Sequence, residues 1–106
     1  ADLVFDVRFL PNPYFVEDLK TKDGRNVDVA QWVISKDTTK EFISKLEDIL
    51  SFLLPLYMQE GKQYLTIAVG CTGGRHRSVV IAEHLTKFLL RKGYSRVELK
   101  HRELSA

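Results

Sequence analysis

The sequence predicts a small α/β domain: a mainly parallel sheet with helices packed on its faces. Strand-like and helix-like segments alternate along the chain, which favours parallel strands joined by helices. Residues 64–69 form an almost continuous apolar run, which is typical of a strand covered on both faces. With right-handed crossovers, the order becomes a β-α-α-β-α-β layer sandwich, a single domain over residues 1–106.

The first half of the chain begins with an expected strand over residues 3–9, which is rich in β-branched and aromatic side chains. A long irregular connection over residues 10–26 follows, and a connection of this length in a compact domain is often functional. We then expect a short helix over residues 27–34, in which Trp32 serves packing.

The second half contains the clearest helix. Thr38 and Glu41 fit a capping box at its start, and apolar residues follow at helical spacing. Pro55 is expected to kink or end this helix, and Gly61 to stop what remains. After the buried strand, a helix over 77–91 ending before Gly93 and a third strand over 96–101 complete the order.

The composition is that of a folded domain without disulfides or a membrane span. Of 106 residues, 44% are hydrophobic and 28% charged. One cysteine excludes an internal disulfide, and three scattered histidines argue against a structural metal site, so no metal is expected. No run of eighteen apolar residues and no signal peptide are present, so we expect a cytoplasmic protein without membrane contact.

The net charge of +2 is unevenly distributed. Residues 1–70 carry a balance of −3, whereas residues 71–106 carry +5. This asymmetry favours an anionic partner near the C-terminal elements, although a solvated basic face explains it equally well.

The strongest functional signal is the segment between the buried strand and the 77–91 helix. We expect an anion site here, most simply for phosphate, because glycines let the backbone curl round a ligand and the helix start offers free N–H groups. Arg77 can bind phosphate oxygens in a bidentate manner, and Ser78 can cap the helix and contact the ligand. The predicted binding residues of the segment are Cys71, Thr72, Gly73, Gly74, Arg75, His76, Arg77 and Ser78.

Two other interpretations of this segment remain open. The first is a tight turn that carries exposed basic residues. The second is a cysteine-dependent phosphatase, because Cys71 and Arg77 have the C-x5-R spacing of such enzymes and a thiol at a helix start is activated. Gly70 stands where those enzymes usually have His, and their Trp-Pro-Asp motif is absent, so we expect no catalytic residue. No Gly-Lys-Ser/Thr follows at Walker spacing, so this domain should bind no ATP or GTP.

Residues outside the segment are expected at the same end of the sheet. Asp6 and Arg8 end the first strand, where Arg8 can hold phosphate and Asp6 a hydroxyl, or both can form a polar strand face. The rigid turn at Pro11–Tyr14 makes Asn12 a further candidate, and His101 and Arg102 follow the third strand, where a frayed end is the simpler interpretation.

These residues together resemble the C-terminal domain of the RapZ/YvcJ family. The similarity rests on Phe5–Pro13, on the string from Tyr64 to Val79 that contains Gly-Cys-Thr-Gly-Gly-Arg-His-Arg-Ser-Val, and on His101-Arg102. It extends over essentially the whole chain in the same order.

The resemblance implies a non-catalytic regulatory domain that binds glucosamine-6-phosphate at the glycine-rich loop. It also implies a separate N-terminal P-loop domain, absent here, to which ATP or GTP binding would belong. In enterobacterial members the domain binds small regulatory RNAs and presents one to ribonuclease E; the candidate RNA-binding residues are Arg75, Arg96, Lys100, His101 and Arg102. A homo-oligomer of the full-length protein is compatible with this picture.

The sequence departs from the family pattern at two positions. Tyr14 stands where members can have His, and Arg75 where they can have Lys. Tyr14 removes a titratable ligand contact, whereas Arg75 keeps the positive charge. The basic C-terminal third permits RNA binding, although no RNP-type aromatic motif is present.

Overall fold

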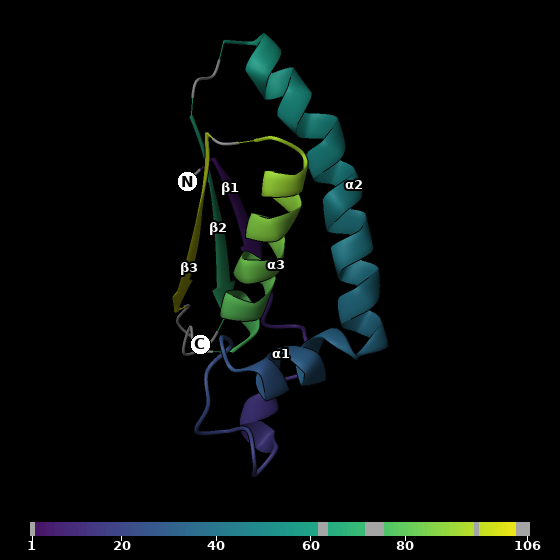
Figure 1. Cartoon of the computed structure of the whole chain (residues 1–106), viewed down its shortest axis with the longest axis vertical. Helices are drawn as coiled ribbons and strands as arrows, with labels where there is room; N and C mark the ends of the chain where they lie inside the picture. The colour runs from purple at the N-terminus through teal and green to yellow at the C-terminus, as the bar shows by residue number, and fades with distance from the viewer. Residues whose placement is uncertain (1, 62–63, 72–75, 95, 104–106) are drawn as a thin grey trace.

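The computed structural model describes residues 2–61, 64–71, 76–94 and 96–103. It is an α/β fold with one parallel three-stranded sheet, which confirms the predicted class (Figure 1). In chain order the elements are β1 (Leu3–Asp6), the 3-10 helix η1 (Pro13–Phe15), α1 (Val27–Ile34), α2 (Asp37–Gln59), β2 (Leu65–Cys71), α3 (Arg77–Arg91) and β3 (Val97–Glu103).

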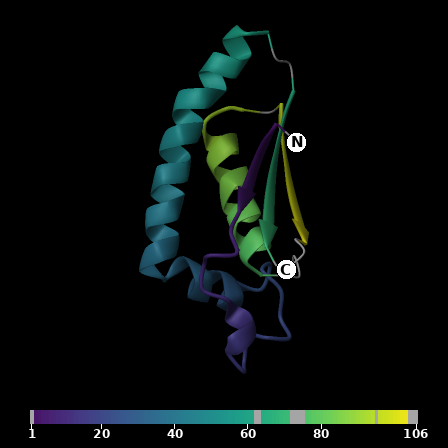
Figure 2. The ribbon, with the colours of Figure 1, turned by 180° about the vertical axis from the view of Figure 1, so that it is seen from behind.

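The sheet has the order β1-β2-β3, and both pairs are parallel. Helices α2 and α3 lie on the same side of it, as Figures 1 and 2 show from opposite directions. This arrangement follows from sequential strand order, because two crossovers of the same hand place both connecting helices on one face. All three strands therefore end at the same edge, where the β2–α3 connection begins.

The main core lies between β2 and the helices. Alternate residues of β2, starting at Leu65 and ending at Cys71, belong to this core together with Leu50 and Leu85. The opposite face of β2 carries Thr66, Ala68 and Gly70. Cover on both faces was expected from the apolar run. Strand β2 is buried at every position except the half-buried Thr66, although both long helices lie on one side of it.

A smaller core joins α1 to α3. It consists of Leu19, Val29, Val33 and Val80, with Trp32 packed against it. The packing role expected for Trp32 is therefore confirmed. Helix α1 begins at the predicted residue because the Asn26 side chain accepts a hydrogen bond from the Asp28 N–H at 2.9 Å.

The capping box predicted at Thr38 is wrong. Helix α2 begins at Asp37 with Lys36 at the N-cap position, and no side chain caps it. Lys36 and Ser35 follow α1 directly, and the short connection fixes where the next helix starts. Local capping chemistry is here overridden by the connection between two packed helices.

Pro55 does not end α2, which continues through it to Gln59. Proline removes one backbone donor, but Leu50 and Leu54 of the same helix are fully buried and their packing outweighs that loss. Gly61, with φ +84°, ends the helix region as predicted, and Gly93 does the same after α3.

The strands differ in length from the prediction. Strand β1 stops at Asp6, three residues early, whereas β2 and β3 continue to Cys71 and Glu103. Parallel pairing sets these ends, because β2 and β3 pair along their full length. Cys71 is therefore the last residue of a strand and not part of a loop.

Candidate functional site

The strand register brings two predicted site residues, Asp6 and Arg102, to either side of Gly70. Asp6 of β1 lies opposite Gly70 of β2, and Gly70 lies opposite Arg102 of β3. The Val7 N–H also donates to the Gly70 carbonyl at 2.8 Å, which continues the pairing just beyond β1. In open α/β sheets this carboxyl edge is where ligands bind, so the geometry places the candidate residues at such a position.

Cys71 is buried, with no exposed surface, at the point where β2 ends. Its Sγ accepts a hydrogen bond from the Ser78 N–H at 3.3 Å, and the thiol donates to Ser78 Oγ at 3.2 Å. These contacts join the end of β2 to the first turn of α3. A buried thiol in this setting is a packing group and a weak hydrogen-bonding group.

Ser78 does not cap α3 as expected. The N-cap position is His76, without a side-chain cap, and Ser78 lies inside the helix with no exposed surface. The predicted Ser78 cap is therefore wrong, because α3 begins two residues earlier than a capping serine requires. Its hydroxyl serves the Cys71 contact.

Arg77 is buried, with only 5% of its surface exposed. Its Nη1 donates to the backbone carbonyl oxygens of Arg8 and Leu10, the latter at 3.1 Å. Its Nε is also buried and has no hydrogen-bond partner in the part of the chain that the structure describes. The guanidinium thus connects the start of α3 to the segment after β1.

His76 faces the long connection that follows β1. Its side chain is 6% exposed, and ring Nε2 hydrogen-bonds to the Lys22 carbonyl oxygen. A carbonyl only accepts, so this ring nitrogen carries the proton. His76 therefore holds the segment around Lys22 against the start of α3.

Asp6 and Arg8 form an ion pair at the end of β1. Arg8 Nη2 lies 2.7 Å from Asp6 Oδ2, and the Arg8 N–H also donates to the same carboxylate at 2.9 Å. The side-chain hydrogen bond from Arg8 is the main cause that holds the pKa of Asp6 below its usual value, followed by the backbone hydrogen bond. The positive charge of Arg77 makes the smallest contribution to that lowered pKa.

Asn12 has a structural role in the turn after β1. Its Oδ1 accepts a hydrogen bond from the Tyr14 N–H at 3.0 Å and caps η1, so the expected rigid turn is confirmed. Tyr14 is 55% exposed, and its ring meets that of Phe15 edge-on, with centroids 5.8 Å apart. Asn12 follows closely on the Leu10 carbonyl that Arg77 binds.

Gly24 approaches the start of α3 closely, which the sequence did not predict. A Cβ at this position would lie 2.6 Å from the His76 carbonyl oxygen and 2.7 Å from Val79 Cβ. Only glycine allows the connection to approach α3 this closely. The length of the irregular connection was the available signal, but the partner of Gly24 is more than fifty residues away in sequence.

The remaining predicted residues fall into two groups. Thr72, Gly73, Gly74 and Arg75 lie outside the described residues, so their role stays a prediction. On β3, Lys100 is exposed and lies 3.8 Å from Glu98, His101 is half-buried opposite Val69, and Arg96 is exposed just before the strand. Within the described part of the chain, no cluster of acidic, His or Cys side chains could hold a metal.

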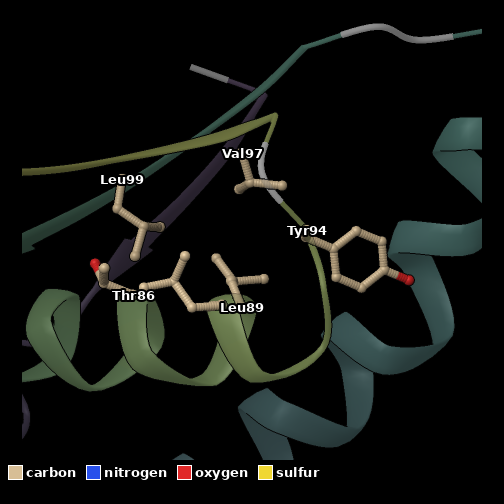
Figure 3. Close-up of a pocket in the computed structure, with 6 residues that line it drawn as sticks. Thr86, Leu89, Tyr94, Val97 and Leu99 are labelled. Carbon is tan, nitrogen blue, oxygen red and sulfur yellow. The ribbon is translucent and has the colours of Figure 1, made fainter.

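A separate apolar groove lies towards the other end of the sheet. It has a volume of about 340 Å³ and is lined by Thr86, Leu89, Leu90, Tyr94, Val97 and Leu99 (Figure 3). Val97 pairs with Leu65 at the amino end of β2, away from Cys71. The groove therefore contains none of the predicted site residues.

Fold and site together define a class: a small parallel α/β domain whose candidate ligand site lies beyond the carboxyl ends of the strands. The chain belongs to the RapZ C-terminal domain family, which it matches over residues 1–105. The family assigned from sequence resemblance is thereby confirmed.

Similar proteins come from several bacteria. The chain is 53% identical over 104 residues to a nucleotide-binding protein of Caldicellulosiruptor bescii. The aligned region covers 98% of this chain and 35% of that protein. It is 55% identical over 103 residues to one of Clostridioides difficile, covering 97% and 36%, and 55% identical over 104 residues to one of Syntrophobacter fumaroxidans, covering 98% and 36%. The chain thus spans about a third of the length of these relatives. In the described residues, no helix is long and apolar enough to cross a membrane.

Proposed function

We propose that this domain is a non-catalytic regulatory domain that binds a phosphorylated amino sugar, glucosamine-6-phosphate, at the carboxyl edge of its sheet. The observation that carries the proposal is the convergence of Asp6, Gly70 and the start of α3 at this edge. The buried Arg77 supports it indirectly, because its Nη1 donates to two carbonyls after β1 and so holds the edge of the site together.

The chemistry of the edge suits the two ends of such a ligand. Helix N–H groups and arginine attract the phosphate, which carries up to two negative charges. The Asp6 carboxylate, kept ionised by its lowered pKa, can accept hydrogen bonds from the sugar hydroxyls or ammonium. Arg8 is held beside it by their ion pair.

Calorimetric titration with glucosamine-6-phosphate tests the proposal. Glucosamine and inorganic phosphate serve as controls that each retain one half of the ligand. We expect binding that needs both halves and is weakened by Asp6→Asn, with Asp48→Asn on the exposed face of α2 as the matched control. Absence of heat at millimolar ligand contradicts the proposal.

The burial of Cys71 weighs against the alternative cysteine phosphatase. Its thiol is inaccessible and engaged with Ser78, whereas a nucleophile must reach phosphorus. We therefore propose that Cys71 forms a wall of the site. Hydrolysis of a generic aryl phosphate that is abolished by Cys71→Ser, without loss of folding, would restore the phosphatase.

RNA binding is the second candidate, as part of the adapter role implied by the resemblance, with a ribonuclease as further partner. The observation that favours it is the alternation along β3: Val97 and Leu99 pack against the core, so the exposed Lys100 lies on the sheet face without long helices. The chain from residue 71 onwards also carries a net charge of +5. We expect affinity for a structured RNA to fall steeply with salt and to decrease in Lys100→Ala. Salt-independent retardation argues against this interface.

A further inference from the structure

We infer that Arg77 is a positioning residue of the proposed site: its guanidinium holds the segment after β1 against the start of α3. The inference rests on the proposed function and assigns Arg77 Nη1 a task other than phosphate binding. The sequence offers Arg77 as a direct phosphate ligand, whereas the structure shows Nη1 bonded to the Arg8 and Leu10 carbonyls.

The contact is strong for physical reasons. A guanidinium is always charged, and its hydrogen bonds to carbonyl oxygens in a buried setting are worth more than neutral ones. Because Arg77 is almost completely buried, water competes poorly for these bonds. The two carbonyls belong to residues more than sixty positions away in sequence.

The held segment carries Arg8, whose side chain is paired with Asp6 in the proposed site. Arg8 offers its carbonyl to Arg77 while its side chain binds Asp6, so one residue transmits the position of α3 to the ion pair. Leu10 is 2% exposed and anchors the other end of the segment in the core. Without the Arg77 contact, β1 would still pair with β2 up to Asp6, but the segment beyond it would lose its link to α3.

A second set of contacts holds a different part of the connection from the part that Arg77 holds. His76 binds the Lys22 carbonyl, and Gly24 lies so close to α3 that a Cβ there would be 2.6 Å from the His76 carbonyl oxygen. These contacts hold the later part of the connection, whereas Arg77 holds the part next to β1. Loss of the Arg77 contact should therefore speed backbone hydrogen exchange in residues 8–12 and not in residues 22–26.

Three measurements on the folded protein test the inference, with Arg77→Lys as variant and Arg91→Lys, at the opposite end of α3, as matched control. The first is backbone hydrogen exchange without ligand. The Leu10 N–H donates to the Val7 carbonyl at 3.1 Å. It should exchange about tenfold faster in Arg77→Lys, because that is the factor expected when a charged hydrogen bond is lost. Second, titration with glucosamine-6-phosphate: affinity should fall about tenfold in Arg77→Lys and stay unchanged in the control.

The third measurement needs no variant. In the wild type, nuclear magnetic resonance of the Arg77 guanidinium should show slowed rotation and protected Nη hydrogens before ligand is added. Nη hydrogens that become restricted only on adding glucosamine-6-phosphate identify a direct ligand and overturn the inference. The inference is also overturned if Arg77→Lys leaves either Leu10 exchange or ligand affinity unchanged.

These outcomes separate the inference from the proposed function. If the wild type does not bind glucosamine-6-phosphate, the proposed function fails, and with it the claim that Arg77 positions a site. The guanidinium and exchange measurements then still report whether the link between α3 and the β1 exit exists. If Arg77→Lys does not fold, the wild-type guanidinium signals alone decide between a link to the backbone and a contact with the ligand.

Discussion

Asp6 shows how a single residue can have a measurable pH signature. Its carboxylate accepts hydrogen bonds from the side chain and the backbone of Arg8, and these lower its pKa in the folded protein. A carboxyl with a lowered folded pKa contributes stability above its unfolded pKa of about 3.9, and this contribution is lost as pH falls through the folded value.

The resulting prediction concerns acid unfolding. We expect the melting temperature of the wild type to exceed that of Asp6→Asn at pH 6, and the difference to shrink as pH falls below about 4. The exposed position of the pair keeps the difference small. Calorimetry from pH 6 to pH 3 measures it; a gap that widens towards acid contradicts the lowered pKa.

Cys71 makes a second residue-level prediction. Because its thiol has no exposed surface, it should react with a disulfide reagent such as dithionitrobenzoate only when the protein opens. The labelling rate should rise by orders of magnitude in denaturant and otherwise follow the opening equilibrium. Rapid stoichiometric labelling of the native protein would show an accessible thiol and revive the phosphatase interpretation.

At the level of elements, Gly24 and Gly61 show two different reasons why a position requires glycine. A Cβ at Gly24 would clash with α3, whereas a Cβ at Gly61 would meet no atom of the described residues within 4 Å, and Gly61 has a φ of +84°. We expect Gly24→Ala to lower the free energy of unfolding by about 1–3 kcal/mol through overpacking. Gly61→Ala should cost about 1 kcal/mol through backbone strain alone.

Denaturant unfolding measures both changes, and a third variant distinguishes their causes. Gly61→Asn should recover part of the loss, because asparagine tolerates positive φ. Gly24→Asn should be at least as harmful as Gly24→Ala, because the larger side chain meets the same atoms. Recovery by asparagine at Gly24 as well as at Gly61 would show that backbone conformation, not space, decides at Gly24.

Helix starts provide a paired test of capping. Asn26→Ala removes a side-chain cap at the start of α1 and should cost about 1 kcal/mol of unfolding free energy. Thr38→Ala lies where no side chain caps α2 and should stay within about 0.5 kcal/mol. Denaturant titration of the two variants decides it. A larger loss at Thr38 would mean that the capping box expected from sequence forms in solution.

The sequence predicted those elements whose signals are local. Helix α1 has its cap in Asn26, and α3 has an apolar stripe and a glycine stop, so their bounds were found. The strand ends could not be found, because pairing with a neighbouring strand sets them. Within the candidate site, the position of Asp6 beside Gly70 followed from parallel topology, whereas the Arg77 and Gly24 contacts join residues distant in sequence and leave no local pattern.

At the scale of the whole molecule, the two ends of the sheet have different characters. The carboxyl edge gathers Asp6, Gly70 and the first turn of α3, whereas the groove of Figure 3 at the amino end is lined mainly by apolar side chains. The residues that line this groove carry no charge, and the Thr86 hydroxyl already donates to the Ala82 carbonyl at 2.9 Å, so a phosphorylated ligand would lose hydration there without gaining a charged partner. The proposed function therefore requires binding at one end only.

This requirement leads to a prediction for the complete domain. At a glucosamine-6-phosphate concentration of about 100 times Kd, binding to the folded state alone should stabilise it by about 2.7 kcal/mol. The melting temperature should then rise by roughly 10 °C or more, which scanning calorimetry measures. Glucosamine without phosphate should produce no such shift at the same concentration.

The location of binding completes the test, because stabilisation alone does not say where the ligand lies. Amide resonances near Asp6, Leu10 and Ser78 should move on titration, whereas those of Leu89 and Val97 beside the groove should stay in place. The two sets lie at opposite ends of the sheet and of α3, so a ligand at one end contacts only one of them. If the larger shifts fall on Leu89 and Val97, the ligand binds in the apolar groove and the carboxyl-edge site is wrong even if the melting temperature rises.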